Sequence, residues 1–392
     1  MVFYLDHAAT TPLRPEARDA WLAASEIAGN ASSTHGAGQA ARRLLEESRE
    51  RLATVLDADP IEVVFTSGGT ESINTALRGL WTARRAGTGT IVLPDGEHHA
   101  TMDTAQALQG DGATLVPVPL DAHARIPASA FAAAVGPEGV ALATAMVANN
   151  EVGTINDARA LAQAAADAAV PLHLDAVAAL GALPLSFRTL RGQAPVGAGL
   201  VALSVTGHKI GAPVGVGALV VARTATLAPL VTGGAQQRGL RAGTQDVAGA
   251  AAFAMAAECA AAEREAEAAR LVLLRDRLVT GIRAAVPRAE LLGDPRDRLP
   301  GNAHLLFPGA VGESLLFLLD TAGIAASTGS ACQAGVAEPS HVVIAMGREA
   351  DARSVLRFTL GRTSTTADVD AVIAAIADAY ARASGPSLAS GT

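Results

Sequence analysis

The sequence of 392 residues contains little cysteine, few aromatic residues and no long apolar run. Its two cysteines, Cys259 and Cys332, are too few for a disulfide framework or a four-cysteine zinc site. We therefore expect a reducing cytoplasmic location and no bound metal. The net charge of −8 argues against a general affinity for nucleic acid or anionic membranes. No stretch approaches the roughly 20 apolar residues of a membrane span, and residues 1–12 lack the pattern of a secretion signal.

The apolar residues that are present form short β-rich runs, which alternate with segments of helical periodicity such as Thr70–Arg85 and Ala158–Ala169. Alternation of this kind predicts an α/β domain with a mainly parallel sheet of seven strands. The expected strands are residues 62–67, 90–94, 113–118, 140–147, 171–176, 200–205 and 217–222.

A long Ala/Glu/Arg-rich helix is expected over Ala248–Ala285 and ends just before Pro287. The pattern then changes to a mixture that predicts a smaller α+β domain. We predict a large domain over residues 12–255, a small domain from 1–11 and 256–384, and a disordered tail over 385–392. The small domain is expected to contain strands near 302–307 and 355–360 and helices near 312–321 and 366–382.

Polar side chains follow several of the expected strands. Lys209 lies in a glycine-flanked turn ("TGHKIG"), where its amine could form a Schiff base. Asp175 ends an apolar strand, and Gly69 and Thr70 open a helix whose N–H groups and dipole favour an anion. Each has a plainer interpretation when it is taken alone: a surface lysine, a helix cap and an ordinary strand–helix turn.

His98 and Asn150 also follow expected strands, and each is an ordinary loop residue when taken alone. Together these side chains supply an anion cradle, an acid, an amine and a ring-stacking group at the edge of one sheet, where α/β folds bind ligands. That set matches the phosphate, pyridine nitrogen, aldehyde and ring face of pyridoxal 5'-phosphate.

Cys332 lies in the stretch "STGSACQAG", among small residues rather than in an apolar core. The thiol is either incidental or carried by a loop that moves it to a reaction partner. Cys259, inside the Ala-rich helix, is interpreted as a packed residue.

The chain resembles a cysteine desulfurase, of the class V aminotransferase family and the iron–sulfur-assembly type. The resemblance spans about residues 4–382 and includes, in order, "YLDHAATTP", "FTSGGTES", "EHHA", "ANNEVG", "HLDA", "GHK", "RAGT", "STGSAC", "EPSH" and "LRFTLGR". It implies a fold-type I pyridoxal-phosphate enzyme, usually a homodimer. The implied reaction converts L-cysteine to L-alanine and leaves the sulfur on Cys332 as a persulfide, from which an acceptor protein takes it.

The resemblance also implies a role for each matching residue. Lys209 would hold the cofactor covalently, and His98 would stack on its ring and help to move protons. Asp175 would pair with the ring nitrogen. Asn150 would contact the ring hydroxyl or the substrate carboxylate, which Arg357 would clamp with its two-pronged guanidinium. The phosphate would be held by Gly69, Thr70, Thr206 and His208, with Thr244 reaching in from the partner subunit.

The chain departs from the family at Ala178, where a glutamine that contacts the ring hydroxyl is usual. Losing one neutral hydrogen bond is worth about 0.5–1.5 kcal/mol. This departure keeps two alternatives open. One is a related enzyme with changed chemistry, such as a β-lyase, a selenocysteine lyase or an aminotransferase. The other is a weakly active scaffold protein.

Overall fold

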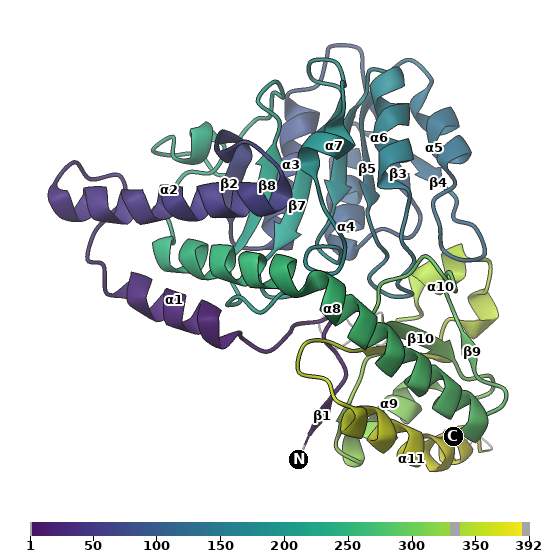
Figure 1. Cartoon of the computed structure of the whole chain (residues 1–392). Helices are drawn as coiled ribbons and strands as arrows, with labels where there is room; N and C mark the ends of the chain where they lie inside the picture. The colour runs from purple at the N-terminus through teal and green to yellow at the C-terminus, as the bar shows by residue number, and fades with distance from the viewer. Residues whose placement is uncertain (1, 330–337, 386–392) are drawn as a thin grey trace, which may run out of the picture.

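The computed structural model describes residues 2–329 and 338–385, and its centre is a seven-stranded sheet (Figure 1). The strand order is β2-β8-β7-β6-β5-β3-β4, and every strand is parallel to the others except β8, which is antiparallel to both of its neighbours. The sheet confirms the predicted mainly parallel α/β fold. Its strands are β2 (Val63–Thr66), β3 (Thr90–Pro94), β4 (Thr114–Val118), β5 (Val140–Met146), β6 (Pro171–Asp175), β7 (Gly199–Thr206) and β8 (Gly217–Val221).

Helices cover both faces of this sheet, because its central strands are apolar on both sides. One face packs on α3 (Gly69–Thr82) and α4 (His99–Gln109). The other face packs on a larger set of helices. Because the strands are parallel, their carboxyl ends lie at one edge of the sheet, which the helices on its two faces leave open. The larger set is α2 (Gly36–Leu56), α5 (Ala128–Val135), α6 (Ala158–Asp167), α7 (Phe187–Arg191) and the start of α8 (Val247–Ala285).

Helix α8 is 39 residues long and leads from the large sheet to the smaller part of the molecule (Figure 1). It lies within one residue of the helix expected from the sequence. Helices α1 (Pro15–Ser25) and α2 pack against it. Its early residues, up to Ala260, belong to the core around the large sheet, and Leu274 begins a second core. The exact division at residue 255 stays a prediction.

The smaller part is built on a three-stranded antiparallel sheet, which confirms its predicted α+β character. The N-terminal strand β1 (Phe3–Tyr4) also belongs to this part, where it forms a separate two-stranded parallel sheet with β11 (Ile324–Ala325). A capping box formed by Thr365 and Asp368 begins the last helix. The remaining elements are β9 (Glu290–Leu291), β10 (Asn302–Leu306), β12 (Val355–Thr359), α9 (Gly312–Thr321), α10 (His341–Ala345) and α11 (Thr366–Ala383).

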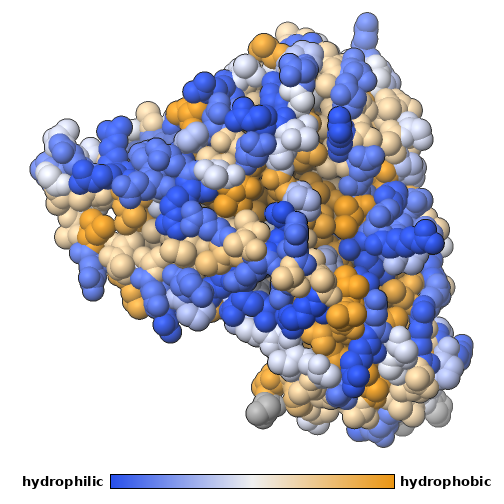
Figure 2. Space-filling model, in the orientation of Figure 1, coloured by the Kyte–Doolittle hydropathy of each residue, from blue (hydrophilic) through white to orange (hydrophobic). Residues whose placement is uncertain are grey.

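The surface carries both polar and apolar residues (Figure 2). Polar residues are frequent along α2, and apolar residues gather near the centre of the view. Within residues 2–329 and 338–385, no helix has the length and apolar character needed to cross a bilayer. The predicted disordered tail, apart from Gly385, and the predicted nucleophile Cys332 lie outside the described residues.

Candidate active site at the carboxyl edge of the sheet

Strand β7 ends in a polar side chain that has no partner within the protein. Thr206 is the last residue of this fully buried strand, and its Oγ1 makes no hydrogen bond. An unsatisfied buried hydroxyl is uncommon and points to a bound group that completes it. The turn that follows brings in His208 and Lys209, both half-buried. Burial, together with the charge of Lys209, lowers the pKa of His208 to about 4.

The turn between β2 and α3 lies beside Thr206. A Cβ added at Gly68 would come within 3.8 Å of Thr206 Oγ1. At Gly69 an added Cβ would lie 2.7 Å from Val177 Cγ2, so only glycine allows this approach to the end of β6. Thr70 is exposed in the first turn of α3. The open N–H groups and the helix dipole make this turn suitable for a phosphate.

Asp175 ends β6, next to β7, and is 6% exposed. Its Oδ1 accepts a hydrogen bond of 2.8 Å from the backbone N–H of Val177. Burial raises the pKa of this carboxyl, while the Val177 bond and the charge of Lys209 act to lower it. A cationic N–H brought next to Asp175 would hold it ionised. A protonated pyridine nitrogen is such a group.

His98 is the N-cap of α4, directly after the turn that follows β3. Its Nδ1 accepts a hydrogen bond of 3.1 Å from Ala100 N–H, so the neutral ring carries its proton on Nε2. Burial, and then the charge of Lys209, lower the pKa of His98 to about 3. The imidazole is therefore neutral, and it offers a flat face and one N–H donor.

Arg357 projects from β12 of the smaller part and is 3% exposed. Its Nη1 donates to the backbone oxygen of Asn150, and its Nη2 donates to Asp6 Oδ1, each over 2.9 Å. The buried Nε has no partner. A carboxylate that accepted from Nε would complete the guanidinium, so Arg357 fits a carboxylate-binding role.

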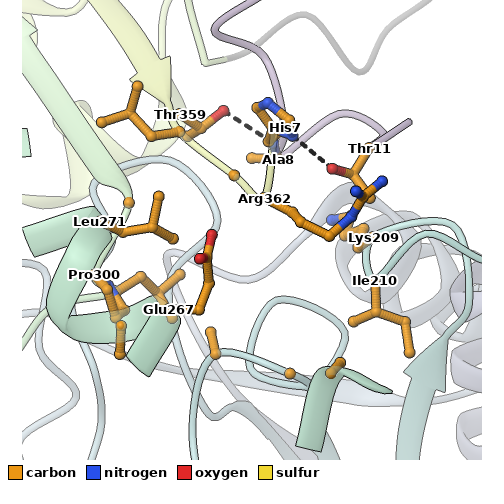
Figure 3. A pocket seen from close by; sticks show the side chains of 18 of the residues that line it. His7, Ala8, Thr11, Lys209, Ile210, Glu267, Leu271, Pro300, Thr359 and Arg362 are labelled. Carbon is orange, nitrogen blue, oxygen red and sulfur yellow. Dashed lines mark hydrogen bonds between the residues drawn. The ribbon is translucent and has the colours of Figure 1, made fainter. Parts of the chain in front are cut away.

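A cavity of about 160 Å³ lies next to Lys209, between the large sheet and the smaller part. Figure 3 shows Lys209 and Thr11 at one side of it, with Glu267 and Leu271 at the other. Asn150 and Ala178 also line this cavity. Alanine adds no hydrogen-bonding group to the wall, and the space beside Lys209 stays open.

Of the sequence-predicted site residues that the structure describes, Asn150 and Lys209 line this cavity, whereas the others do not: Gly69, Thr70, His98, Asp175, Thr206, His208, Thr244 and Arg357. Thr244 is exposed in the loop before α8. Cys332 lies in residues 330–337, outside the described residues. In the part of the chain that the structure describes, no group of three or more His, Cys, Asp and Glu side chains is arranged to hold a metal ion.

Three acids near the site were not predicted: the partly exposed Asp6 and the buried Glu97 and Glu151. Glu97 precedes His98 and is fully buried, and Glu151 follows Asn150 and is 2% exposed. Each of these two is adjacent in sequence to a predicted residue, and Asp6 belongs to the quoted "YLDHAATTP" stretch. Their positions next to these residues in the sequence were the only signal that could have predicted them.

The unpartnered Thr206 hydroxyl, the glycine turn, the buried acid and the lysine together fit pyridoxal 5'-phosphate. The chain matches the family model of class-V aminotransferases over residues 3–372, and that class depends on this cofactor. An IscS-like cysteine desulfurase of Mycobacterium tuberculosis is 48% identical over 393 residues, which cover 98% of each chain. The chain belongs to the cysteine desulfurases of the class-V aminotransferase family.

Solved structures agree with this assignment. A NifS-like protein superimposes with a TM-score of 0.89 at 30% identity, covering 97% of this chain and 100% of that chain. SspA, solved in complex with cysteine, gives a TM-score of 0.78 at 27% identity, covering 92% of this chain and 99% of that chain. The match extends over nearly the whole length of both proteins and confirms the fold.

Proposed function

We propose that this enzyme converts L-cysteine to L-alanine and transfers the sulfur to Cys332 as a persulfide. The observation that carries the proposal is that two buried groups, Thr206 Oγ1 and Arg357 Nε, have no hydrogen-bond partner within the protein. Thr206 Oγ1 faces the phosphate-type turn, and Arg357 Nε provides a buried donor for a carboxylate. Support for the substrate comes from the relatives, which are named cysteine desulfurases, and from SspA, which binds cysteine.

The cofactor residues divide by the part of pyridoxal phosphate that each would hold. Lys209 would bind it covalently, Asp175 would pair with its ring nitrogen and His98 would stack on its ring. Asn150 would contact the ring hydroxyl or the substrate carboxylate. The phosphate would be held by Gly69, Thr70, Thr206 and His208, together with the partner subunit's Thr244.

The chain's own residues orient the substrate and move its protons. When bound, pyridoxal phosphate supplies the electron sink for the substrate's α-carbon. Arg357 would hold the substrate carboxylate, because its buried Nε–H has no acceptor within the protein. Lys209 then takes the α-proton. His98 donates through Nε2, since Nδ1 is occupied by the Ala100 N–H. Its lowered pKa keeps the ring neutral, so Nε2–H serves as a hydrogen-bond donor.

The thiolate form of Cys332 would be the nucleophile, because a thiol does not attack sulfur effectively. An acceptor protein would take the persulfide sulfur, for iron–sulfur assembly or a thiolation pathway. We also infer a homodimer in the cytoplasm without nucleic-acid or membrane partners. Thr244 is exposed in the loop before α8, so a partner subunit could reach it.

The test is turnover of L-cysteine, with alanine measured and the Cys332 peptide analysed by mass spectrometry. We expect alanine and a mass gain of one sulfur atom on that peptide. Cys332→Ser should lose turnover and keep the visible absorption of the bound cofactor. Unchanged turnover in this variant would remove Cys332 from the reaction. Rapid keto-acid formation with an amino acceptor would instead favour changed chemistry, for which the open wall at Ala178 leaves room.

A further inference from the structure

Glu151 is a buried acid that has no role in the reaction as proposed above. It follows Asn150 and is 2% exposed. Its carboxylate reaches across to the smaller part of the molecule. Ser340 Oγ donates to Oε2 over 2.5 Å, and His341 Nδ1 lies 3.7 Å from Oε1. A buried carboxylate is costly unless such partners compensate it. The Ser340 hydrogen bond therefore defines a specific link between two parts of the chain.

The same carboxylate contacts Gly329, which lies in the upstream flank, the stretch of chain just before residues 330–337. A Cβ added at Gly329 would lie 3.1 Å from Glu151 Oε2, so the backbone of Gly329 packs directly on this side chain. Gly329 N–H also donates to Ser327 Oγ over 3.0 Å, and the backbone of Ser327 pairs with that of Arg357. The upstream flank is thus held between Glu151 and the carboxylate-binding arginine.

The downstream flank begins α10 and is held in the same place. Ser340 is 1% exposed, and its Oγ accepts from Val343 N–H as the helix N-cap while it donates to Glu151. Its neighbour His341 donates from Nε2 to the backbone oxygen of Glu97 over 2.9 Å. The start of α10 is therefore fixed both to Glu151 and to the residue that precedes His98.

The backbone of Glu151 is held independently of its side chain. Its N–H donates to Asn149 Oδ1 over 2.9 Å. Its carbonyl oxygen accepts from Asn302 Nδ2 over 3.0 Å, and His304 Nδ1 lies 3.1 Å from the same oxygen. A change confined to the side chain should leave this loop, and Asn150 within it, in place. Glu151 therefore offers a way to disturb the two flanks alone.

We propose that Glu151 is a positioning residue that holds both flanks of the segment containing Cys332 against the loop containing Asn150. The inference rests on the proposed function and concerns its sulfur-transfer step. In that step the Cys332 thiolate forms a bond to the substrate sulfur and the substrate's carbon–sulfur bond breaks. The electron pair stays on the β-carbon, which takes up a proton, so the products are alanine and the persulfide. Displacing a reacting group by about 1 Å costs about 10²-fold in rate.

The test compares Glu151→Ala and Glu151→Gln with the wild-type holoenzyme in a single turnover of L-cysteine. Persulfide on the Cys332 peptide is followed by mass spectrometry, and substrate binding is followed by the visible absorption of the cofactor. We expect Glu151→Ala to slow persulfide formation about 10²-fold and to change half-saturation by cysteine by less than about twofold. Glu151→Gln keeps an oxygen acceptor for Ser340 Oγ, so it should recover part of the rate.

The matched control is Thr154→Val on the same loop. Thr154 is fully buried, its Oγ1 donates to His123 O and accepts from Asp294 N–H, and these bonds link the loop to other segments without involving either flank. We expect a lower Tm and a wild-type rate of persulfide formation.

The outcomes separate the inference from the function on which it rests. A wild-type rate in both Glu151 variants, or in Glu151→Gln if Glu151→Ala does not fold, overturns the inference. An equal slowing in Thr154→Val overturns it as well, because any loosened contact would then have the same effect. A wild-type enzyme that forms no persulfide overturns the proposed function itself.

Discussion

The proposed cofactor side and the proposed substrate side of the site are assembled in different ways. On the cofactor side, Asp175 and Thr206 end two adjacent strands, and the register of β6 and β7 places their ends at one edge. On the substrate side, Arg357, Asp6 and Asn150 come from a small-domain strand, the N-terminal segment and a large-domain loop. One side follows from the pairing of neighbouring strands, and the other depends on contacts between distant parts of the chain.

The two sides also differ in which bonds are already made. Thr206 Oγ1 makes no hydrogen bond within the protein, so its role depends on the ligand. Two of the three guanidinium nitrogens of Arg357 are already bound to other residues. Changes on the cofactor side should therefore weaken ligand binding without weakening the fold. Changes on the substrate side should affect binding and stability together.

The largest effect is expected for Thr206→Val. The hydroxyl has no internal partner, so its removal costs no bond in the apoprotein. With the phosphate bound, it removes a hydrogen bond to a charged group, which is worth about 1.5–3 kcal/mol. We expect the Kd for pyridoxal phosphate to rise roughly 10- to 100-fold. Equilibrium dialysis of the apoprotein measures the Kd, and calorimetry measures its Tm.

The apoprotein Tm is the control for this variant, and it should be unchanged or slightly higher than that of the wild type. An apoprotein that is clearly destabilised would mean that Thr206 supports the fold, and the contrast between the two sides would then fail. A wild-type affinity for the cofactor would remove Thr206 from the phosphate site.

The second prediction compares Asp6→Ala with Asp6→Asn. Asp6 Oδ1 accepts from Arg357 Nη2, and alanine removes this acceptor while asparagine keeps one. We expect Asp6→Ala to raise KM for L-cysteine about tenfold, in line with the loss of a hydrogen bond to a charged group, and to lower Tm. Asp6→Asn should stay within about twofold of the wild-type KM. Steady-state kinetics below the unfolding range measure both.

The asparagine variant decides what Asp6 contributes. If Asp6 fixes the direction of Arg357, an uncharged acceptor is sufficient. If both variants raise KM equally, the charge of Asp6 is what matters, and the interpretation of Asp6 as an orienting acceptor is wrong.

The strand ends on the proposed cofactor side could be predicted because their signals are local. The strands that end there, such as β6 and β7, are buried apolar runs, and a polar residue closes each one, as at Asp175. Asp6 and Glu151 were not predicted, because their partners Arg357 and Ser340 lie 351 and 189 positions away. Nothing in the spacing along the chain predicts contacts of that length.

The N-terminal helices show a different kind of omission. Helix α2 has Leu45, Leu52 and Leu56 buried on one face, and this helical spacing is readable from the sequence. The alternation of strands and helices that predicts the α/β domain begins only at β2, so it does not include this helix. For Asp6 and Glu151, by contrast, only the folded chain supplies the information.

The smallest effect on activity is expected for Glu97→Gln. Glu97 is fully buried, its Oε1 accepts from Met146 N–H over 2.8 Å, and its Oε2 has no partner. Burial, and then the charge of Asp175, raise the pKa of this carboxyl well above its usual value of 4.5. The folded protein therefore holds the neutral acid, which glutamine resembles in shape. We expect turnover within about twofold of wild type, because the substitution removes no charge present in the folded state.

The pH dependence of Tm tests the protonation of Glu97 more strictly than turnover does. Below pH 4.5 the carboxyl is protonated in both the folded and the unfolded chain, and Glu97 adds no pH dependence. As the pH rises, the unfolded chain releases this proton while the folded chain keeps it, so the wild type loses stability. Glutamine does not titrate. The Tm of the variant minus that of the wild type should therefore increase from about pH 5 to about pH 8. A difference that stays constant over this range would mean that Glu97 is already ionised in the folded protein.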